Sequence, residues 1–357
     1  MKKKPWVVGL VLVAIVAALV VWGRGRIHFD VHVFLAQVRQ ADWVKIALAL
    51  GCIYLAYVLR AFRWARLMRH NKQVSGLSLV GTQVIGFTAV ALIGRVADPV
   101  RPYLVARKTG QELSSQIAVY IVERLFDAGT MAFIFSVVIL LAEPGAMPHP
   151  EIVKRAGIWG MAFTLAGALF LVAVRMAGGL VAGAFERAFG IFSKKLGHAA
   201  GHKIRTFRAG LDTMRSLGDF AWAAGLSLVM WGLITEAYLA TAQAFTASPE
   251  LASMTLAKCI LLLAFSGGAS ALQLPILGWF TQIGFVAAAM SKFYGVGAEA
   301  STACAATILL VTFLGIVPVG LIWAQFEHVS LRKVAHESEH ADEALEVDEP
   351  AGEQAGS

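Results

Sequence analysis

Long uninterrupted runs of apolar residues constrain this chain more than any other feature, because an α-helix needs about 20 such residues to cross a bilayer. Nine apolar segments can be distinguished, at about 6–22, 44–59, 77–93, 117–141, 158–174, 220–246, 257–274, 280–294 and 302–323. Their side chains are apolar continuously rather than at alternate positions, which excludes a transmembrane β-barrel. With 58% hydrophobic and 15% charged residues, the chain is predicted to be an all-α polytopic membrane protein.

The net charge of +8 is spread unevenly along the chain. Residues 334–357 contain eight of the 23 acidic residues and no Lys or Arg, so residues 1–333 carry an excess of 16 positive charges. In a membrane protein such an excess reports loop orientation and contact with anionic lipids, and no nucleic-acid-binding pattern accompanies it. We therefore expect membrane lipids with anionic headgroups as partners. The change in composition after residue 333 predicts a transmembrane domain over 1–333 and a disordered, acidic cytoplasmic tail over 334–357.

The distribution of Lys and Arg between the apolar segments predicts the topology. The three lysines at 2–4 place the start of the chain in the cytoplasm, and the basic stretch 60–72, two crossings later, agrees with this. If every later segment crossed fully, the basic amphipathic helix expected over 180–217 would lie outside, against the positive-inside rule. The conflict disappears if 77–105 enters and leaves the membrane on the same side, which its prolines favour.

The second half of the chain repeats this pattern, since two spans flank a hairpin at 257–294 that breaks near Pro275. We predict two units, 44–141 and 220–323, in opposite orientation, each with one re-entrant hairpin of broken helices. This gives six to seven full spans. We expect the protein to lie in the inner membrane of the cell, with both termini in the cytoplasm. In inverted repeats of this kind the substrate site lies where the broken helices meet. Nine simple spans are the alternative.

The stretch VYIVERLFD at 119–127 places three charges inside an apolar segment. Glu123 and Asp127 are four positions apart and share a helix face with the neighbouring Arg124. Each ionised group near the bilayer centre costs about 2.5–3.5 kcal/mol on insertion scales, so this face is expected to point into protein or an aqueous cavity. Either an Arg124–Asp127 pair joins two helices, or these charges line a path for a polar headgroup.

The stretch GRVADPVRPYLV at 94–105 supplies charges beside the first predicted break. Arg95 and Arg101 flank Asp98, and Pro99 and Pro102 interrupt the helix. Guanidinium groups bind phosphate bidentately and stay charged when desolvated, so this loop is a candidate for binding an anionic headgroup. The alternative is a structural loop in which Asp98 pairs with one of the arginines.

Two further polar residues lie in later apolar segments. Glu236 is a solitary acid in MWGLITEAYLATAQAF, and a lone intramembrane acid is a functional candidate by default. It is expected either to pair with Arg124 or Arg101, or to carry a proton. Gln282 lies close to the break at Pro275 and is expected to hydrogen-bond freed backbone groups or to line the site.

These motifs resemble the transmembrane, flippase-like domain of the lysylphosphatidylglycerol synthase family. The resemblance covers about 44–326 and rests on RAFRWARLM (60–68), the 94–105 and 119–127 stretches, LQLPILGWFTQIGFV (272–286) and YGVGAEASTACAATILLVTF (294–313). ERLFD matches the family's Glu-Arg-apolar-apolar-Asp pattern in full. Two departures stand out: Ala97-Asp98 replaces the usual Gly-Glu, and Thr281 or Gln282 replaces the usual acid after the second break.

The resemblance implies that the protein moves an anionic phospholipid or polyprenyl-linked lipid between leaflets. Because the chain continues for only about 30 residues after its last predicted span, we expect no synthase domain, no enzymatic activity, and neither a cofactor nor a metal. One alternative is a non-transporting scaffold for a lipid-modifying enzyme or glycosyltransferase, and another is a small-solute transporter. The candidate substrate-binding residues are Arg95, Asp98, Arg101, Glu123, Arg124, Asp127, Glu236 and Gln282.

Overall fold

The computed structural model describes residues 29–69, 72–142, 150–191, 193–199, 201–202, 216–270, 277–327 and 329. Within these ranges the chain is helical and contains no strand, and six of its helices are long and apolar enough to cross a membrane. The predicted all-α polytopic membrane class is therefore confirmed. The predicted span at 6–22, the break at Pro275 and the acidic tail at 334–357 lie outside the described residues.

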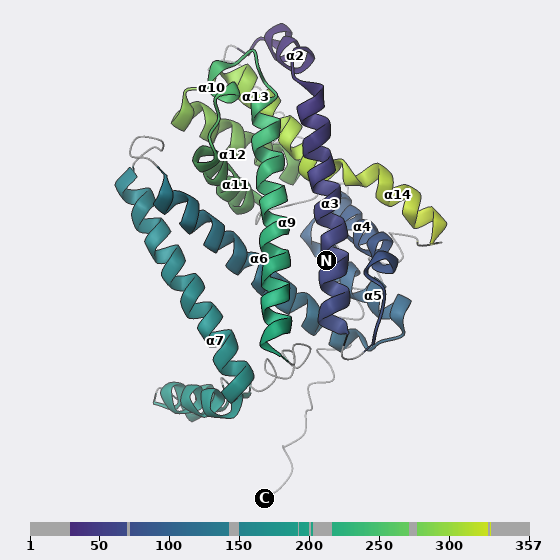
Figure 1. Ribbon diagram of the computed structural model, residues 1–357, viewed down its shortest axis with the longest axis vertical. Coiled ribbons are helices and arrows are strands. Elements are labelled where there is room, and N and C mark those ends of the chain that lie inside the picture. Colours follow the sequence, from purple (N-terminus) through teal and green to yellow (C-terminus); the bar gives the residue numbers. More distant parts are fainter. Residues whose placement is uncertain are drawn as a thin grey trace, which may run out of the picture.

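Two long helices, α3 (Trp43–Met68) and α9 (Leu217–Gln243), pack against each other along the long axis of the molecule (Figure 1). At 1.5 Å per residue each is about 40 Å long, which exceeds the ~30 Å hydrocarbon thickness. α3 begins after Asp42, whose carboxylate accepts hydrogen bonds from the amides of Val44 and Lys45 at 3.0 and 3.3 Å. This pair forms the axis around which the other helices are arranged.

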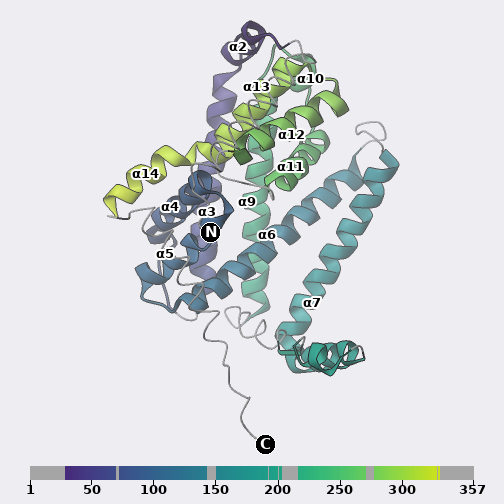
Figure 2. The same cartoon turned by 180° about the vertical axis from the view of Figure 1, so that it is seen from behind.

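A second pair is formed by α6 (Leu113–Leu141), which crosses the molecule obliquely past α9, and α7 (Pro150–Gly190), which packs on α6 at one side of the molecule (Figures 1 and 2). Many apolar side chains of α7 are exposed, among them Trp159, Phe163 and Leu169, as expected for a lipid-facing helix. The helix kinks at Ala177, and its last part runs across the molecular axis (Figure 1). That part contains the start of the basic amphipathic helix predicted over 180–217, of which residues 203–215 lie outside the described chain.

The first predicted break is present. α4 (Gly76–Ile93) ends at Gly94, which adopts a φ of 93° that only glycine accepts readily. A short 3-10 turn, η1 (Arg95–Ala97), leads into α5 (Val100–Thr109), which packs back against α4. Pro99 precedes the first residue of α5, where a missing amide hydrogen costs no helical hydrogen bond. About two thirds of α4 is buried, more than in the other long apolar helices.

In the second half, α11 (Leu256–Ser270) and α12 (Leu277–Tyr294) pack against each other. Both views place them towards the end that carries α2 (Val31–Arg39) and α10 (Pro249–Ala252), whereas α4 and α5 lie towards the other end (Figures 1 and 2). The α4–α5 hairpin and the α11–α12 pair thus lie towards different ends of the axis, which is compatible with the predicted inverted repeat. The face of the membrane from which each enters stays a prediction.

The last predicted span bends in the structure. α13 (Ala298–Leu309) continues through one π-helical turn, η2 (Leu310–Leu314), into α14 (Ile316–Phe326). α14 packs on α4 through glycines: a Cβ at Gly320 would collide with Thr88, and one at Gly81 would collide with Trp323. Small residues allow such close helix contacts inside membranes. This packing fixes the last helix against the first broken element.

Candidate functional site

The charges of the ERLFD motif meet two arginines of α3. Arg60 and Arg63 are three positions apart, and Glu123 and Asp127 are four apart, so each pair occupies one helix face. Arg63 binds both carboxylates, with Nη2 2.7 Å from Glu123 Oε1 and Nη1 2.8 Å from Asp127 Oδ1. Arg60 Nη1 lies 3.1 Å from Asp127 Oδ2. Arg63 and Glu123 are fully buried, so these ion pairs join α3 and α6 inside the protein.

Arg101 of α5 completes the same network. Its Nη2 lies 2.8 Å from Glu123 Oε2, and its Nε and Nη2 donate to Gln83 Oε1 at 3.1 and 2.7 Å. The guanidinium also lies over the rings of Phe87 and Trp64, at 4.2 and 5.1 Å from their centroids. Arg101 is fully buried. It ties α5 to α4 and α6 and is not among the residues that line the cavity described below, so its predicted binding of phosphate stays a prediction.

Arg124 is held more loosely than the other arginines. Its Nη2 lies 3.2 Å from Asp127 Oδ2 and 3.7 Å from Glu123 Oε1, and 38% of its side chain is exposed. Its Nε and Nη2 have no hydrogen-bond acceptor of good geometry. Both of these nitrogens are buried, so a further anion could reach only the exposed part of the Arg124 side chain. The predicted Arg124–Asp127 pair is present, but as one part of a larger network.

We refer to Arg60, Arg63, Arg101, Glu123, Arg124 and Asp127 as the ionic cluster. It contains four guanidinium groups and two carboxylates, so it carries two positive charges in excess. Uncompensated charge inside a membrane protein is costly unless it is paired or lines a polar path. An anion that enters this region would therefore reduce the electrostatic free energy of the folded protein.

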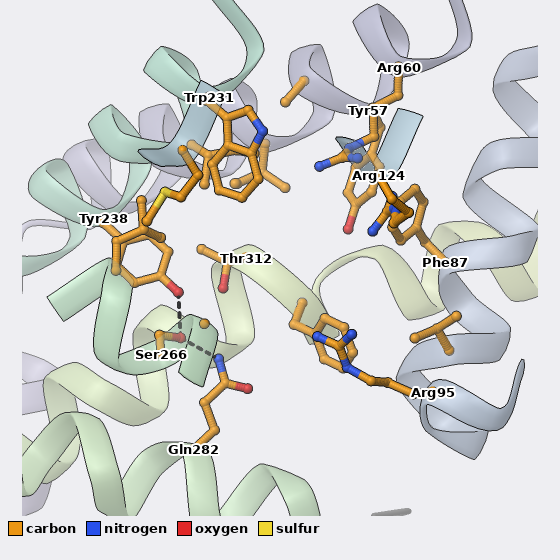
Figure 3. Close-up of a pocket in the computed structure, with 18 of the residues that line it drawn as sticks. Tyr57, Arg60, Phe87, Arg95, Arg124, Trp231, Tyr238, Ser266, Gln282 and Thr312 are labelled. Carbon is orange, nitrogen blue, oxygen red and sulfur yellow. Dashed lines mark hydrogen bonds between the residues drawn. The ribbon is translucent and has the colours of Figure 1, made fainter. Parts of the chain in front are cut away.

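A cavity of about 270 Å³ lies beside the ionic cluster, and both halves of the chain line it. Figure 3 shows the guanidinium side chains of Arg60, Arg95 and Arg124 on one side. The opposite side carries neutral polar groups, and aromatic rings complete the lining. The aromatic and neutral polar lining residues are Tyr57, Phe87, Trp231, Tyr238, Ser266, Gln282 and Thr312.

The neutral side of the cavity is built from α9, α11 and α12. The Tyr238 hydroxyl lies 2.8 Å from Ser266 Oγ, and Gln282 Nε2 donates to the same oxygen at 2.7 Å. Trp231, also on α9, donates through Nε1 to Asp127 Oδ1 at 3.3 Å, which links this helix to the ionic cluster. Ion pairs within the first predicted unit and the Trp231–Asp127 hydrogen bond between the two units therefore hold the charged side of the cavity.

The structure brings most of the predicted site residues together. Arg95, Asp98, Arg124 and Gln282 line the cavity, while Glu123 and Asp127 lie directly behind its charged side in the ionic cluster. Glu236 is the exception, because its side chain is exposed on α9 and no ion pair joins it to Arg124 or Arg101. The expected pairing is not found among the described residues, and a proton-carrying role for Glu236 stays a prediction.

Two arginines of the cluster were not among the predicted site residues. Arg60 and Arg63 counted in the sequence as cytoplasmic loop charges, because Arg66, Arg69 and Lys72 follow them. In the structure both are buried inside α3, so only the later part of this basic stretch could be the predicted cytoplasmic loop. Arg60 and Arg63 are three positions apart, as are Arg124 and Asp127 on α6, and this spacing on one helix face was the signal that could have found them.

Among the described residues, no group of three or more His, Cys, Asp or Glu side chains is arranged to hold a metal ion. The charged side of the cavity carries guanidinium groups, which repel metal cations, and one carboxylate, Asp98. The charged side of this lining is therefore better suited to an anion than to a metal cation.

Comparison with protein families agrees with the geometry of the site. A family model described as "Lysylphosphatidylglycerol synthase TM region" matches residues 6–320, which include every residue of the ionic cluster and of the cavity lining. The chain belongs to this family. Membership makes it a multi-pass membrane protein of a family related to lipid modification and lipid flipping. No curated protein and no solved structure matches the chain.

Proposed function

We propose that this family member moves an anionic phospholipid or polyprenyl-linked lipid between the leaflets of the inner membrane. The observation that carries the proposal is the position of the cavity: it lies between the two halves of the chain, beside a buried cluster with two excess positive charges. The headgroup would occupy the cavity, and the acyl or prenyl chains would stay in the bilayer.

The residues have distinct roles in this proposal. Arg124, Arg95 and Arg60 face the cavity and would bind the phosphate, since guanidinium groups pair with phosphate oxygens in a bidentate manner. Glu123 and Asp127 would not touch the lipid but hold the arginines in place. During transport these contacts would replace the water that hydrates the headgroup, and no covalent bond would form or break. For this reason we propose a transporter and not an enzyme.

The orientation follows from charge. We propose that both termini are cytoplasmic, because the lysines at 2–4 and the exposed basic residues Arg187, Lys194 and Lys195 after the kink of α7 would then face the same side. These basic residues would contact anionic headgroups at that surface.

The proposal is tested by following lipid movement in proteoliposomes. Phosphatidylglycerol with a fluorescent acyl chain is placed in both leaflets, and the fraction accessible to a membrane-impermeant quencher is measured over time. The parent protein is expected to make nearly all of the label accessible. Arg124→Gln, which removes the most loosely held guanidinium, is expected to slow the movement at least about tenfold, because a charge-assisted phosphate contact contributes roughly 1.5–3 kcal/mol.

Arg107→Gln is the matched control, since Arg107 is an exposed arginine in the last turn of α5 and lies outside the cavity lining. It is expected to behave as the parent does. Background movement in parent and variants alike would contradict the proposal and favour the scaffold for a lipid-modifying enzyme. Equal, fast movement in parent and Arg124→Gln would contradict the role of the cavity.

A further inference from the structure

The two sides of the cavity differ in charge as well as in position. Three guanidinium groups face the cavity from the first half of the chain, from α3, η1 and α6. The described lining residues include one carboxylate, that of Asp98, and it lies close enough to Arg124 to interact with it electrostatically. The cavity therefore offers strong sites for an anion and no carboxylate that is free of a neighbouring guanidinium.

The two carboxylates behind this side are not accessible to a ligand. Glu123 is fully buried and accepts hydrogen bonds from Arg63 at 2.7 Å and from Arg101 at 2.8 Å. Asp127 is 5% exposed and is held by Arg60, Arg63 and the indole of Trp231. An ammonium group on a headgroup would thus meet net positive charge, and the one carboxylate in the described lining, Asp98, already lies close to Arg124.

The opposite side suits hydroxyl groups. Tyr238, Ser266, Gln282 and Thr312 are uncharged and carry hydroxyls or an amide, which both donate and accept hydrogen bonds. The hydroxyls of a glycerol, inositol or sugar have the same dual character and could join the Tyr238–Ser266–Gln282 chain of hydrogen bonds. At about 270 Å³ the cavity lies near the lower end of the ~300–1,000 Å³ typical of ligand pockets, which suits a headgroup alone.

We infer that this cavity selects lipids whose phosphate carries an uncharged, hydroxyl-bearing group, and that it discriminates against lipids in which that group carries an amine. The inference rests on the proposed function and specifies the substrate class of the same site. Aminoacylated or ethanolamine-bearing phospholipids would be disfavoured because the desolvated ammonium would be repelled by the arginines and would find only neutral partners opposite.

The test compares headgroups on identical fluorescent acyl chains in the proteoliposome assay. Phosphatidylglycerol and phosphatidylinositol represent the favoured class, lysylphosphatidylglycerol and phosphatidylethanolamine the disfavoured class, and phosphatidate a phosphate without a polyol. The parent protein is expected to move the first two at least about tenfold faster than the two amine-bearing lipids, since unfavourable placement of like charge costs more than about 1.4 kcal/mol.

Two variants separate the contributions of the neutral side. Ser266→Ala is expected to slow phosphatidylglycerol and phosphatidylinositol several-fold while leaving phosphatidate unchanged, because phosphatidate has no hydroxyl to place there. Gln282→Glu adds a carboxylate with little change of shape and is expected to raise the rate for lysylphosphatidylglycerol relative to phosphatidylglycerol. This gain for one lipid cannot arise from misfolding.

The outcomes distinguish this inference from the function on which it rests. If amine-bearing lipids move as fast as phosphatidylglycerol, or if Gln282→Glu changes no ratio, the headgroup selection is refuted while lipid movement stands. If no lipid moves above background in any arm, lipid movement itself is refuted, and the selection falls with it.

Discussion

Substitution of Glu123 by Gln is the perturbation that bears most directly on the ionic cluster. The Glu123 carboxylate accepts from Arg63 at 2.7 Å and from Arg101 at 2.8 Å, and it is fully buried. Glutamine keeps one acceptor oxygen and nearly the same shape, so one of the two short bonds can persist. The other bond and the negative charge are lost, and the excess charge of the cluster rises from two to three.

The magnitude follows from these contacts. A hydrogen bond to a charged group contributes about 1.5–3 kcal/mol, and breaking a buried ion pair by removing one partner costs about 3–5 kcal/mol because the other charge stays buried. We expect Glu123→Gln to lower the free energy of unfolding by about 3–5 kcal/mol. Adding Arg101→Gln should recover part of this loss, since the excess charge returns to two.

The assay is reversible unfolding in mixed micelles at increasing SDS, followed by tryptophan fluorescence. Glu327→Gln is the control, because Glu327 forms an ion pair with Lys108 at 2.6 Å but both side chains are partly exposed. Such pairs contribute at most about 1 kcal/mol. If Glu123→Gln unfolds at the same SDS fraction as Glu327→Gln, the cluster is not a desolvated ion-pair network and the reasoning is wrong.

Two further predictions concern the frame that holds the cavity. Gly320→Ala should lower the free energy of unfolding by about 1–3 kcal/mol, because the added Cβ would collide with Thr88. Gly51→Ala is the control: nothing lies within 4 Å of a Cβ there, so it should be neutral or slightly stabilising. Equal effects of the two substitutions would contradict the close packing of α14 on α4. Asp42→Ala should lower the free energy of unfolding by about 1 kcal/mol, because it removes the N-cap of α3. Asp42→Asn should retain most of the stability. If Asp42→Ala unfolds at the same SDS fraction as the parent, the cap contributes nothing.

Features that depend on local sequence could be predicted well. The helical membrane class follows from the length of the apolar runs, and the break after α4 follows from Gly94 and Pro99, because backbone conformation at these residues depends on neighbours in the chain. The inward direction of Glu123 and Asp127 follows from the cost of exposing them to lipid. These predictions needed no knowledge of tertiary contacts.

The partners of these charges could not be predicted in the same way. Arg63 and Glu123 are 60 residues apart, and only the packing of α3 against α6 brings them together. From the sequence, Arg60 and Arg63 were predicted to begin a basic loop, because periodicity alone does not show where a helix leaves the membrane. Arg101 was expected to bind a ligand because its residue type suits phosphate, but in the structure its Nε and Nη2 donate to Gln83 and Glu123 and its side chain is fully buried.

Glu236 shows that the free-energy cost of placing a charge in the bilayer does not by itself predict which way a side chain faces. A lone acid in an apolar segment was expected to face the cluster, yet it lies on an exposed part of α9. The helix face that a residue occupies depends on how the helix is rotated against its neighbours. For α9 this rotation is fixed by Trp231 and Tyr238, which point into the cavity.

The most direct test of the central claim is photocrosslinking from inside the cavity. A photoreactive phenylalanine analogue is placed at Trp231, which lines the cavity, and in a second protein at Phe163, which is 75% exposed on α7. After irradiation in phosphatidylglycerol vesicles, mass spectrometry identifies the lipid fragment attached to each position. We predict attachment to the headgroup or glycerol from position 231 and to acyl chains from position 163. Acyl-chain attachment from both positions, or no lipid at position 231, would contradict the claim that a headgroup occupies this cavity.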